Sequence, residues 1–278
     1  MNREQVVGMF VGAFLGDMLG APYEFEDRLD AEDVKLTTGG AHNVSLGEYT
    51  DDGALTLALG ESYVSRGYFD AEDAAKRFRQ WALTGKYGTR DYVFDIGTTT
   101  SNAINRMRYD DVVYAAIGND RDSGNGSLMR IAACIAANHT NPMRALADTV
   151  AASLMTHGNS DILEYTTAFV DELMNGASTQ YSHLKCHPEK FANARGTIMY
   201  AYNAARHALH HGGSDGGAVL RHAVSFGYDT DTNACIAGMW VGAKYGISCF
   251  PQEYVDALQN KKRIFEVANK LFEIGASK

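Results

Sequence analysis

Two short acidic clusters contain the residues of this sequence whose types and spacing are most suited to chemistry. The first is Thr50-Asp51-Asp52 and the second is Asp229-Thr230-Asp231-Thr232, and each stands directly before an apolar, helix-like run. One Ser, Thr, Asp or Asn is enough to cap a helix, and an acid in the first turn also favours the helix dipole. Either cluster alone could be a cap. Together they place four carboxylates and at least two hydroxyls at two helix starts, which capping does not explain.

If these two helix starts meet in space, their carboxylates repel one another unless a cation neutralises them. Sets of carboxylate and hydroxyl oxygens suit hard cations such as Mg²⁺ or Mn²⁺. The charge of two divalent cations would balance about four carboxylates. The pattern therefore favours a metal site between the clusters over capping alone.

A third candidate is the turn Gly124-Asn125-Gly126-Ser127, which precedes another helix-like run. Two glycines permit unusual backbone angles, and the free N–H groups of a helix start can bind phosphate oxygens. Arg130 falls in the first turn of that run. An ordinary turn and cap is the alternative for this loop by itself. Combined with a metal site, the loop suggests a phosphorylated or nucleotide-like ligand.

Two single residues stay open between structural and functional interpretations. Asp95 precedes the threonine-rich helix start "IGTTTSNAI", where it could be a cap. His157 lies at the end of a predicted helix, and a lone histidine there is more often structural.

The elements that must position these residues are helices. Leu55, Leu59 and Tyr63 recur at helical spacing, no segment alternates convincingly at period two, and only four prolines interrupt the chain. We therefore predict an all-α fold with long loops near residues 22–52, 86–96, 118–126 and 176–187. The predicted helices are 2–20, 53–66, 70–84, 97–107, 127–138, 142–156, 160–175, 188–210, 216–225, 232–246 and 261–274.

Two of these helices carry glycine at every fourth position. Gly8, Gly12, Gly16 and Gly20 form one row, and Gly238, Gly242 and Gly246 form the other. Each glycine costs about 1 kcal/mol of helix stability relative to alanine. A row at this spacing makes a smooth ridge against which another backbone can pack closely. The rows predict a compact helical centre with both acidic clusters beside it.

Composition limits the remaining possibilities. The 278 residues are 45% hydrophobic and show no clear domain break, so we expect a single domain over residues 1–278. The formal net charge of −9 argues against sequence-independent nucleic-acid binding. Residues 6–22 are apolar, but Asp17 interrupts them and the flanks lack signal-peptide features, which predicts a buried core helix. The four separated cysteines indicate reduced thiols in a cytoplasmic protein.

Taken in order, the motifs resemble those of the ADP-ribosylglycohydrolase family over nearly the whole chain. The matching segments are "GAFLGDMLGAPYEF" (12–25), "YTDDG" (49–53), "DIGTTT" (95–100), "GNGSLMR" (124–130), "THG" (156–158) and "DTDTNACIAGMWVGAKYG" (229–246). No single motif is decisive, but six in the family's order are highly specific.

The resemblance implies a compact all-α, orthogonal multi-helix domain with a dinuclear Mg²⁺ or Mn²⁺ centre in a cleft. The implied metal ligands are Thr50, Asp51, Asp52, Asp229, Asp231 and Thr232. The implied catalytic residues are Asp95, Glu24 and Asp52. The implied ADP-ribose-binding residues are Gly124, Asn125, Gly126, Ser127, Met129 and His157. Two positions depart from the family's pattern: Gly53 stands where many members have threonine, and Tyr228 where many have glycine.

The implied reaction is hydrolysis at the anomeric carbon of an ADP-ribosyl group, with a metal-associated water that Asp95 or Glu24 orients or deprotonates. The expected substrate is ADP-ribosyl-arginine on a protein, or a small-molecule ADP-ribosyl conjugate, acted on by a monomer away from membranes. Serine-linked, nucleotide-linked and O-acyl-ADP-ribose remain alternatives. A catalytically silent ADP-ribose-binding protein on the same fold and a metal-dependent phosphohydrolase are the functional rivals.

Overall fold

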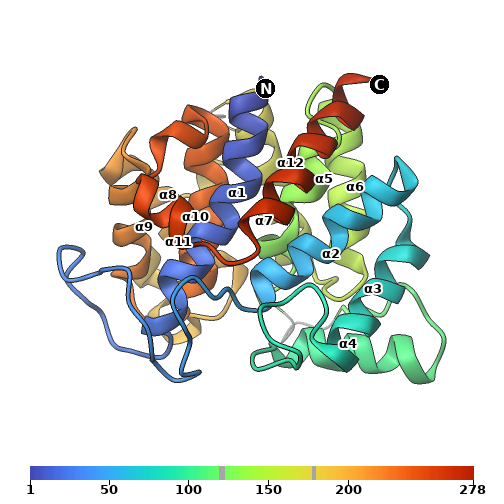
Figure 1. Ribbon diagram of the computed structural model, residues 1–278, viewed down its shortest axis with the longest axis horizontal. Coiled ribbons are helices and arrows are strands. Elements are labelled where there is room, and N and C mark those ends of the chain that lie inside the picture. The colour runs from blue at the N-terminus through green and yellow to red at the C-terminus, as the bar shows by residue number, and fades with distance from the viewer. Residues whose placement is uncertain (119–122, 177–179) are drawn as a thin grey trace.

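The computed structural model describes residues 1–118, 123–176 and 180–278, and their regular structure is helical (Figure 1). The part of the chain that the structure describes contains two isolated β-bridges and no longer strand. The prediction of an all-α fold is therefore confirmed. The helices are α1 (Arg3–Gly20), α2 (Asp51–Arg66), α3 (Ala71–Thr84), α4 (Thr98–Tyr109), α5 (Ala132–Ala136), α6 (Pro142–Leu154), α7 (Ser160–Asn175), α8 (Ile198–Gly212), α9 (Gly216–Val224), α10 (Thr230–Tyr245), α11 (Gln252–Ala257) and α12 (Lys261–Ala276).

The two glycine-rich helices, α1 and α10, pack against each other at backbone distance and run in opposite directions. A Cβ added to Gly12 would lie 2.4 Å from the carbonyl oxygen of Gly238, and one added to Gly16 would lie 2.0 Å from that of Ala234. No side chain fits in such a space. The glycine rows thus allow the close helix contact that the sequence predicts.

This central pair explains why α1 is apolar on all sides. Every residue of α1 from Val6 to Gly20 is buried. By length and composition the segment Arg3–Tyr23 could cross a membrane, but 94% of its most apolar window is buried inside the protein. The prediction of a buried core helix is confirmed. Figure 1 shows α1 in the middle, with α8, α9 and α10 on one side and α2, α3 and α12 on the other.

The end of α1 contacts the start of α10, where the second acidic cluster lies. A Cβ added to Gly20 would lie 2.5 Å from the Cα of Asp231, so the end of α1 touches the start of α10. Thr230 Oγ1 also donates a hydrogen bond of 2.8 Å to the carbonyl oxygen of Gly20. The second acidic cluster is therefore held against the last turn of α1.

Two predicted helices are interrupted in the structure. The run predicted as 127–138 is a 3₁₀ turn, Leu128–Arg130, followed by the short α5. The run predicted as 188–210 is a 3₁₀ stretch, Pro188–Ala194, and then α8. Between these last two elements the chain pairs with another loop: the N–H of Asn125 donates to the Gly196 carbonyl at 3.2 Å, and that of Ile198 to the Ser123 carbonyl at 2.8 Å. This tertiary pairing overrides the local helical pattern.

Candidate functional site

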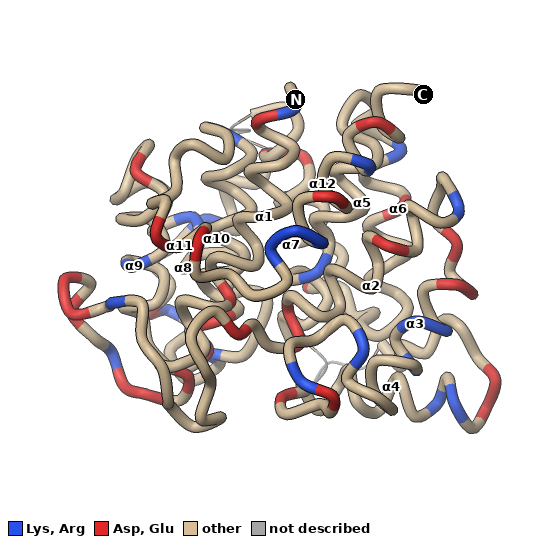
Figure 2. Tube along the Cα trace, viewed as in Figure 1, with Lys and Arg blue, Asp and Glu red and all other residues tan. Residues whose placement is uncertain are grey.

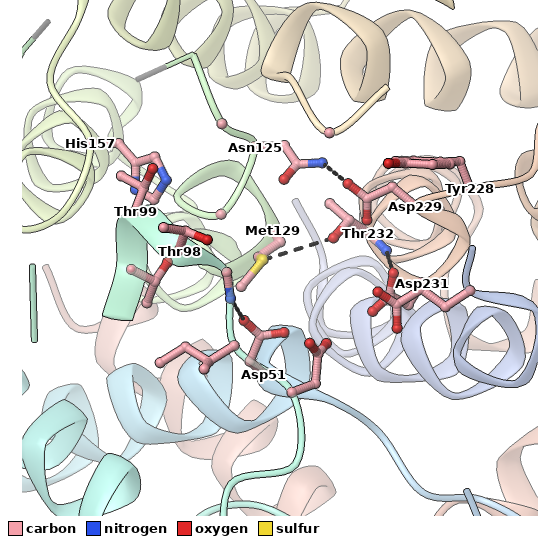
Figure 3. A pocket seen from close by; sticks show the side chains of 18 of the residues that line it. Asp51, Thr98, Thr99, Asn125, Met129, His157, Tyr228, Asp229, Asp231 and Thr232 are labelled. Atoms are coloured by element: carbon pink, nitrogen blue, oxygen red, sulfur yellow. Dashed lines mark hydrogen bonds between the residues drawn. The ribbon is translucent and has the colours of Figure 1, made fainter. Parts of the chain in front are cut away.

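A cavity of about 380 Å³ opens where the start of α10, the start of α4 and the 124–126 loop meet (Figure 3). Its volume falls within the range of small-molecule sites. Most residues singled out from the sequence line it: Glu24, Asp51, Asp95, Gly124, Asn125, Gly126, Met129, His157, Asp229, Asp231 and Thr232. The other three, Thr50, Asp52 and Ser127, are buried and do not line the cavity.

The first acidic cluster begins α2, but it does not cap that helix with its own side chains. Thr50 occupies the N-cap position and makes no side-chain capping bond. The carboxylate of Asp17, from α1, accepts hydrogen bonds from the N–H groups of Thr50 at 2.9 Å and Gly53 at 2.8 Å. Capping, the alternative interpretation of this cluster, is therefore wrong for its side chains. Because Asp17 caps α2, the side chains of the cluster are left for other contacts.

Gly53 is explained by the same packing. A Cβ at this position would lie 2.6 Å from Cδ2 of Tyr49 and 2.9 Å from Cδ1 of Phe14. A side chain at this position would clash with these two rings, so core packing accounts for Gly53.

The two acidic clusters converge although about 180 residues separate them along the chain. Thr50 Oγ1 lies 3.1 Å from Asp231 Oδ2, and Thr232 Oγ1 lies 3.3 Å from Asp52 Oδ2. Asp51, Asp95 and Asp231 each present a carboxylate oxygen within 4.8 Å of the other two. The sequence-based expectation that the two helix starts meet is confirmed.

The convergence is electrostatically costly for the protein alone. Burial, followed by repulsion from neighbouring carboxylates, raises the pKa of Asp51, Asp52 and Asp231 well above the usual aspartate value. The same causes raise the pKa of Glu24 to about 10. Asp52 Oδ1 is buried without a hydrogen-bond partner in the described chain. An unpaired oxygen and unbalanced charge in an oxygen-only set are what a hard divalent cation would satisfy, so the residues fit such an ion.

These shifts predict a pH dependence for the cation-free protein. Carboxyl groups with a raised pKa keep protons in the folded chain that the unfolded chain has lost, so stability falls as pH rises. Between about pH 7 and about pH 9 we expect the free energy of unfolding to fall by up to about 1.4 kcal/mol per pH unit for each proton held. The melting temperature should fall with it. Thermal melts in chelator and in saturating Mg²⁺ check this. The slope should flatten with Mg²⁺, and equal slopes in both conditions would contradict the charge assignment.

The second cluster is joined to the glycine loop. Asp229 occupies the N-cap position of α10 without making a side-chain cap, and its Oδ2 accepts a hydrogen bond of 2.7 Å from Asn125 Nδ2. Figure 3 shows this bond between the loop and the start of α10. Asn125 therefore links the candidate phosphate loop to the candidate metal ligands.

The glycine loop and His157 form the other end of the cavity. His157 is buried, its Nδ1 lies 2.7 Å from Thr156 Oγ1, and burial lowers its pKa to about 3, so the imidazole is neutral. A Cβ on Gly126 would come within 3.0 Å of Thr100 Oγ1 and 3.2 Å of His157 Cε1. The loop thus brings bare backbone to the cavity wall.

Arg130, in the first turn after the glycine loop, does not line the cavity. Its fully buried guanidinium donates to the carbonyl of Gly126 at 2.5 Å and to Thr156 Oγ1 at 2.6 Å. It therefore holds the loop and the His157 segment together from behind.

Asp95 and Glu24 both line the cavity. Gly97 occupies the N-cap position of α4, and the N–H of Gly97 donates a hydrogen bond of 3.3 Å to Asp51 Oδ2. The structure therefore does not support Asp95 as the cap. Burial raises the pKa of Asp95 to about 6. Glu24 Oε2 lies 2.8 Å from Nε2 of His42, and that nitrogen is 3.7 Å from Asp95 Oδ1.

His42 and Asp17 are the site residues that sequence reasoning missed. His42 lies in the long loop before α2, where nothing around it forms a motif. The Arg90 guanidinium donates hydrogen bonds to the carbonyl oxygens of His42 at 3.2 Å and Asn43 at 3.0 Å, and these bonds hold that loop in place. Asp17 did carry a signal, because a charge inside an otherwise apolar helix must find buried partners.

Comparison with known proteins gives consistent matches over the full length. A family model described as ADP-ribosylglycohydrolase matches residues 1–278. "ADP-ribosylarginine hydrolase Tri1" of Serratia proteamaculans is 26% identical over 294 residues, 98% of this chain and 80% of its own. "ADP-ribosyl-[dinitrogen reductase] glycohydrolase" of Rhodospirillum rubrum is 26% identical over 279 residues, 93% of this chain and 92% of its own. A solved structure titled "ADP-ribosylglycohydrolase-related protein complex" aligns with TM-score 0.81 and 28% identity over 98% of both chains.

Proposed function

Because the chain belongs to the ADP-ribosylglycohydrolase family, we propose that it hydrolyses the bond between ADP-ribose and an arginine guanidinium on a modified protein. The family makes it a glycosidic hydrolase, and the arginine linkage follows the similar ADP-ribosylarginine hydrolase Tri1 of Serratia proteamaculans. The observation that carries the proposal is the meeting of Asp51, Asp95 and Asp231 at one cavity.

Two divalent cations, Mg²⁺ or Mn²⁺, would be held by the two acidic clusters. Thr50 and Asp52, although they do not line the cavity, lie directly behind Asp231 and Thr232 and can complete the ligand set. The full set proposed is Thr50, Asp51, Asp52, Asp229, Asp231 and Thr232. When bound, the cations supply positive charge that makes a nearby water more acidic and stabilises negative ligand oxygens.

Asp95 is the proposed base. Its pKa, raised to about 6 by burial, lies near neutral pH, where a general base is most effective. It would take a proton from the water whose oxygen bonds to the anomeric carbon, while the bond from that carbon to the guanidinium nitrogen breaks. The proton then passes to the departing nitrogen, so that the products are ADP-ribose and unmodified arginine.

Glu24 and Asp52 have supporting roles in this scheme. Glu24 faces Asp95 through His42 and is the alternative group for orienting the water. Asp52 is deeply buried, with an unpaired oxygen, and would act by fixing the water's surroundings.

The loop at the other end of the cavity would hold the diphosphate. Gly124, Asn125 and Gly126 present backbone there, and Met129 and His157 line the wall beside them. The side chain of Ser127 is fully buried and its hydroxyl has no hydrogen-bond partner among the described residues. Ser127 can contribute only through its backbone.

Replacing Gly126 by valine should block ADP-ribose binding and leave metal binding intact. The added atoms would fall against Thr100 and His157 at the cavity wall. Overpacking of this kind costs about 1–3 kcal/mol, which is on the order of 10- to 100-fold in affinity. Calorimetric titrations with ADP-ribose and with Mg²⁺ check the two halves of the prediction. Equal ADP-ribose affinity in variant and parent would count against the loop's role.

We expect the enzyme to work as a cytoplasmic monomer on ADP-ribosylated proteins or small-molecule conjugates. The net charge of −9 supports a substrate that is not nucleic acid. Figure 2 shows Lys and Arg interspersed with Asp and Glu along the described trace. A panel of arginine-, serine-, thymidine- and O-acyl-linked ADP-ribose, analysed by mass spectrometry, tests the linkage. Release of free arginine is the expected result, and cleavage of another linkage in its place would overturn the arginine assignment.

A further inference from the structure

Two exposed aromatic side chains, Phe25 and Tyr228, stand at the mouth of the cavity. Both line it, and they are 56% and 46% exposed. Their ring centroids are 6.1 Å apart with the planes at 83°. The N–H of Phe25 donates to the Tyr228 carbonyl at 2.6 Å, and the N–H of Tyr228 donates to the Glu26 carbonyl at 2.7 Å. Two segments far apart in sequence are therefore fixed together as one aromatic pair.

The backbone of both residues is in the left-handed region, with φ of 67° for Phe25 and 65° for Tyr228. Residues with a Cβ adopt this region at a cost, and such strained positions gather at functional sites. Neither ring recovers the cost by burial, because both are exposed.

The two ends of the cavity differ in charge. Gly124, Gly126 and the neutral His157 line the cavity with bare backbone and an uncharged ring. At the other end the aromatic pair is flanked in sequence by Glu24 and Asp229, both of which line the cavity. Figure 3 shows Tyr228, Asp229 and Asp231 on the side away from His157. An anionic diphosphate suits the first end, and a cationic group suits the second.

The Tyr228 ring already lies near a guanidinium within the protein. The Cζ of Arg195 is 6.0 Å from its centroid, which is at the limit of a cation–π contact. Arg195 Nε has no hydrogen-bond partner in the described chain. The exposed parts of the Tyr228 and Phe25 rings could contact a second planar cation.

We propose that Phe25 and Tyr228 form the acceptor subsite and select a planar cationic acceptor, a guanidinium, over neutral hydroxyl acceptors. The inference rests on the proposed function and assigns it a specificity determinant. The cation would lie against the aromatic faces with Glu24 and Asp229 beside it, while a serine-linked acceptor would gain neither contact.

The test compares arginine-linked and serine-linked ADP-ribosyl peptides. The variants are Tyr228→Leu, which removes the ring but keeps the Cβ and thus the backbone strain, and Tyr228→Phe, which keeps the ring. Tyr109→Leu is the matched control, because Tyr109 is 75% exposed, lies outside the cavity and also has a guanidinium, that of Arg108, 5.2 Å from its ring. Each protein is assayed for kcat/KM and, in an Asp95→Asn background, for peptide affinity by calorimetry.

Tyr228→Leu should weaken affinity and kcat/KM for the arginine-linked peptide by about 5- to 30-fold, the worth of a cation–π contact, and leave the serine-linked peptide within about 2-fold. Tyr228→Phe and Tyr109→Leu should match the parent. Equal losses on both peptides, or no loss on either, would overturn the subsite. If the protein bound the arginine-linked peptide selectively through Tyr228 but did not hydrolyse it, the subsite would be supported and the proposed reaction contradicted. Absence of binding to either peptide would remove both.

Discussion

Replacing Asp231 by asparagine will remove most of the affinity for Mg²⁺ and Mn²⁺ and nearly all turnover, while the fold survives. Asp231 belongs to the second cluster and reaches the first through Thr50 Oγ1 at 3.1 Å, and it also accepts a hydrogen bond from the N–H of Thr232 at 2.8 Å. Removing a residue that only hydrogen-bonds to a metal ligand already costs about 10- to 100-fold in metal affinity, so removing a ligand itself should cost more. An asparagine oxygen can still accept the Thr232 bond, which preserves the start of α10.

The melting temperature separates this effect from unfolding. Because burial and repulsion raise the pKa of Asp231, the neutral amide should leave the cation-free protein as stable as the parent or more so. Asp148→Asn is the matched control: this buried carboxylate bonds Tyr63 and Asn138 at 2.9 Å each, outside the cavity. It should lower the melting temperature without changing the metal titration. Unchanged metal binding by folded Asp231→Asn protein would refute the ligand assignment.

Replacing Asp95 by asparagine will lower turnover far more than it lowers affinity for ADP-ribose. Loss of a positioned general base costs about 10²–10⁴ in rate. The amide has the same size and can accept a hydrogen bond through its oxygen, so ground-state binding should change little. If Asp95 were only a helix cap, asparagine would replace it fully. Gly97, and not Asp95, occupies the N-cap position of α4, and the N–H of Gly97 donates to Asp51. Both observations argue against that alternative.

Three measurements on this one variant decide the matter: turnover, ADP-ribose affinity and melting temperature. We expect a large fall in the first and near-parent values for the other two. Near-parent turnover in a stable Asp95→Asn protein would remove Asp95 from the mechanism and make Glu24 the base, which Glu24→Gln would then test.

The frame of the site could be predicted because its signals are local and periodic. Glycine at every fourth position indicated the close contact of α1 with α10, and the contact of Gly20 with Asp231 shows why that contact places the second cluster. An excess of acids over what capping needs indicated that the two clusters meet. Residue type and spacing along one helix were sufficient for these inferences.

The parts that failed depend on partners distant in sequence. Asp17 takes over the cap of α2, and no pattern near Thr50 reveals this. Arg130 points away from the cavity because the Gly126 carbonyl and Thr156 bind it from behind. The break before α8 exists because residues 196–198 pair with residues 123–125. Such choices are made by tertiary hydrogen bonds that compete with local helix propensity.

The most direct test of the central claim is the product released from an ADP-ribosyl-arginine peptide by protein stripped with a chelator and then resupplied with Mg²⁺ or Mn²⁺. Mass spectrometry of the reaction should show no turnover in the stripped protein. After addition of the cation it should show equal amounts of ADP-ribose and peptide with unmodified arginine. Persistent absence of turnover with the cation bound would identify a silent ADP-ribose-binding protein, and release of phosphate or AMP would identify a phosphohydrolase. Either result would contradict metal-dependent glycosidic hydrolysis.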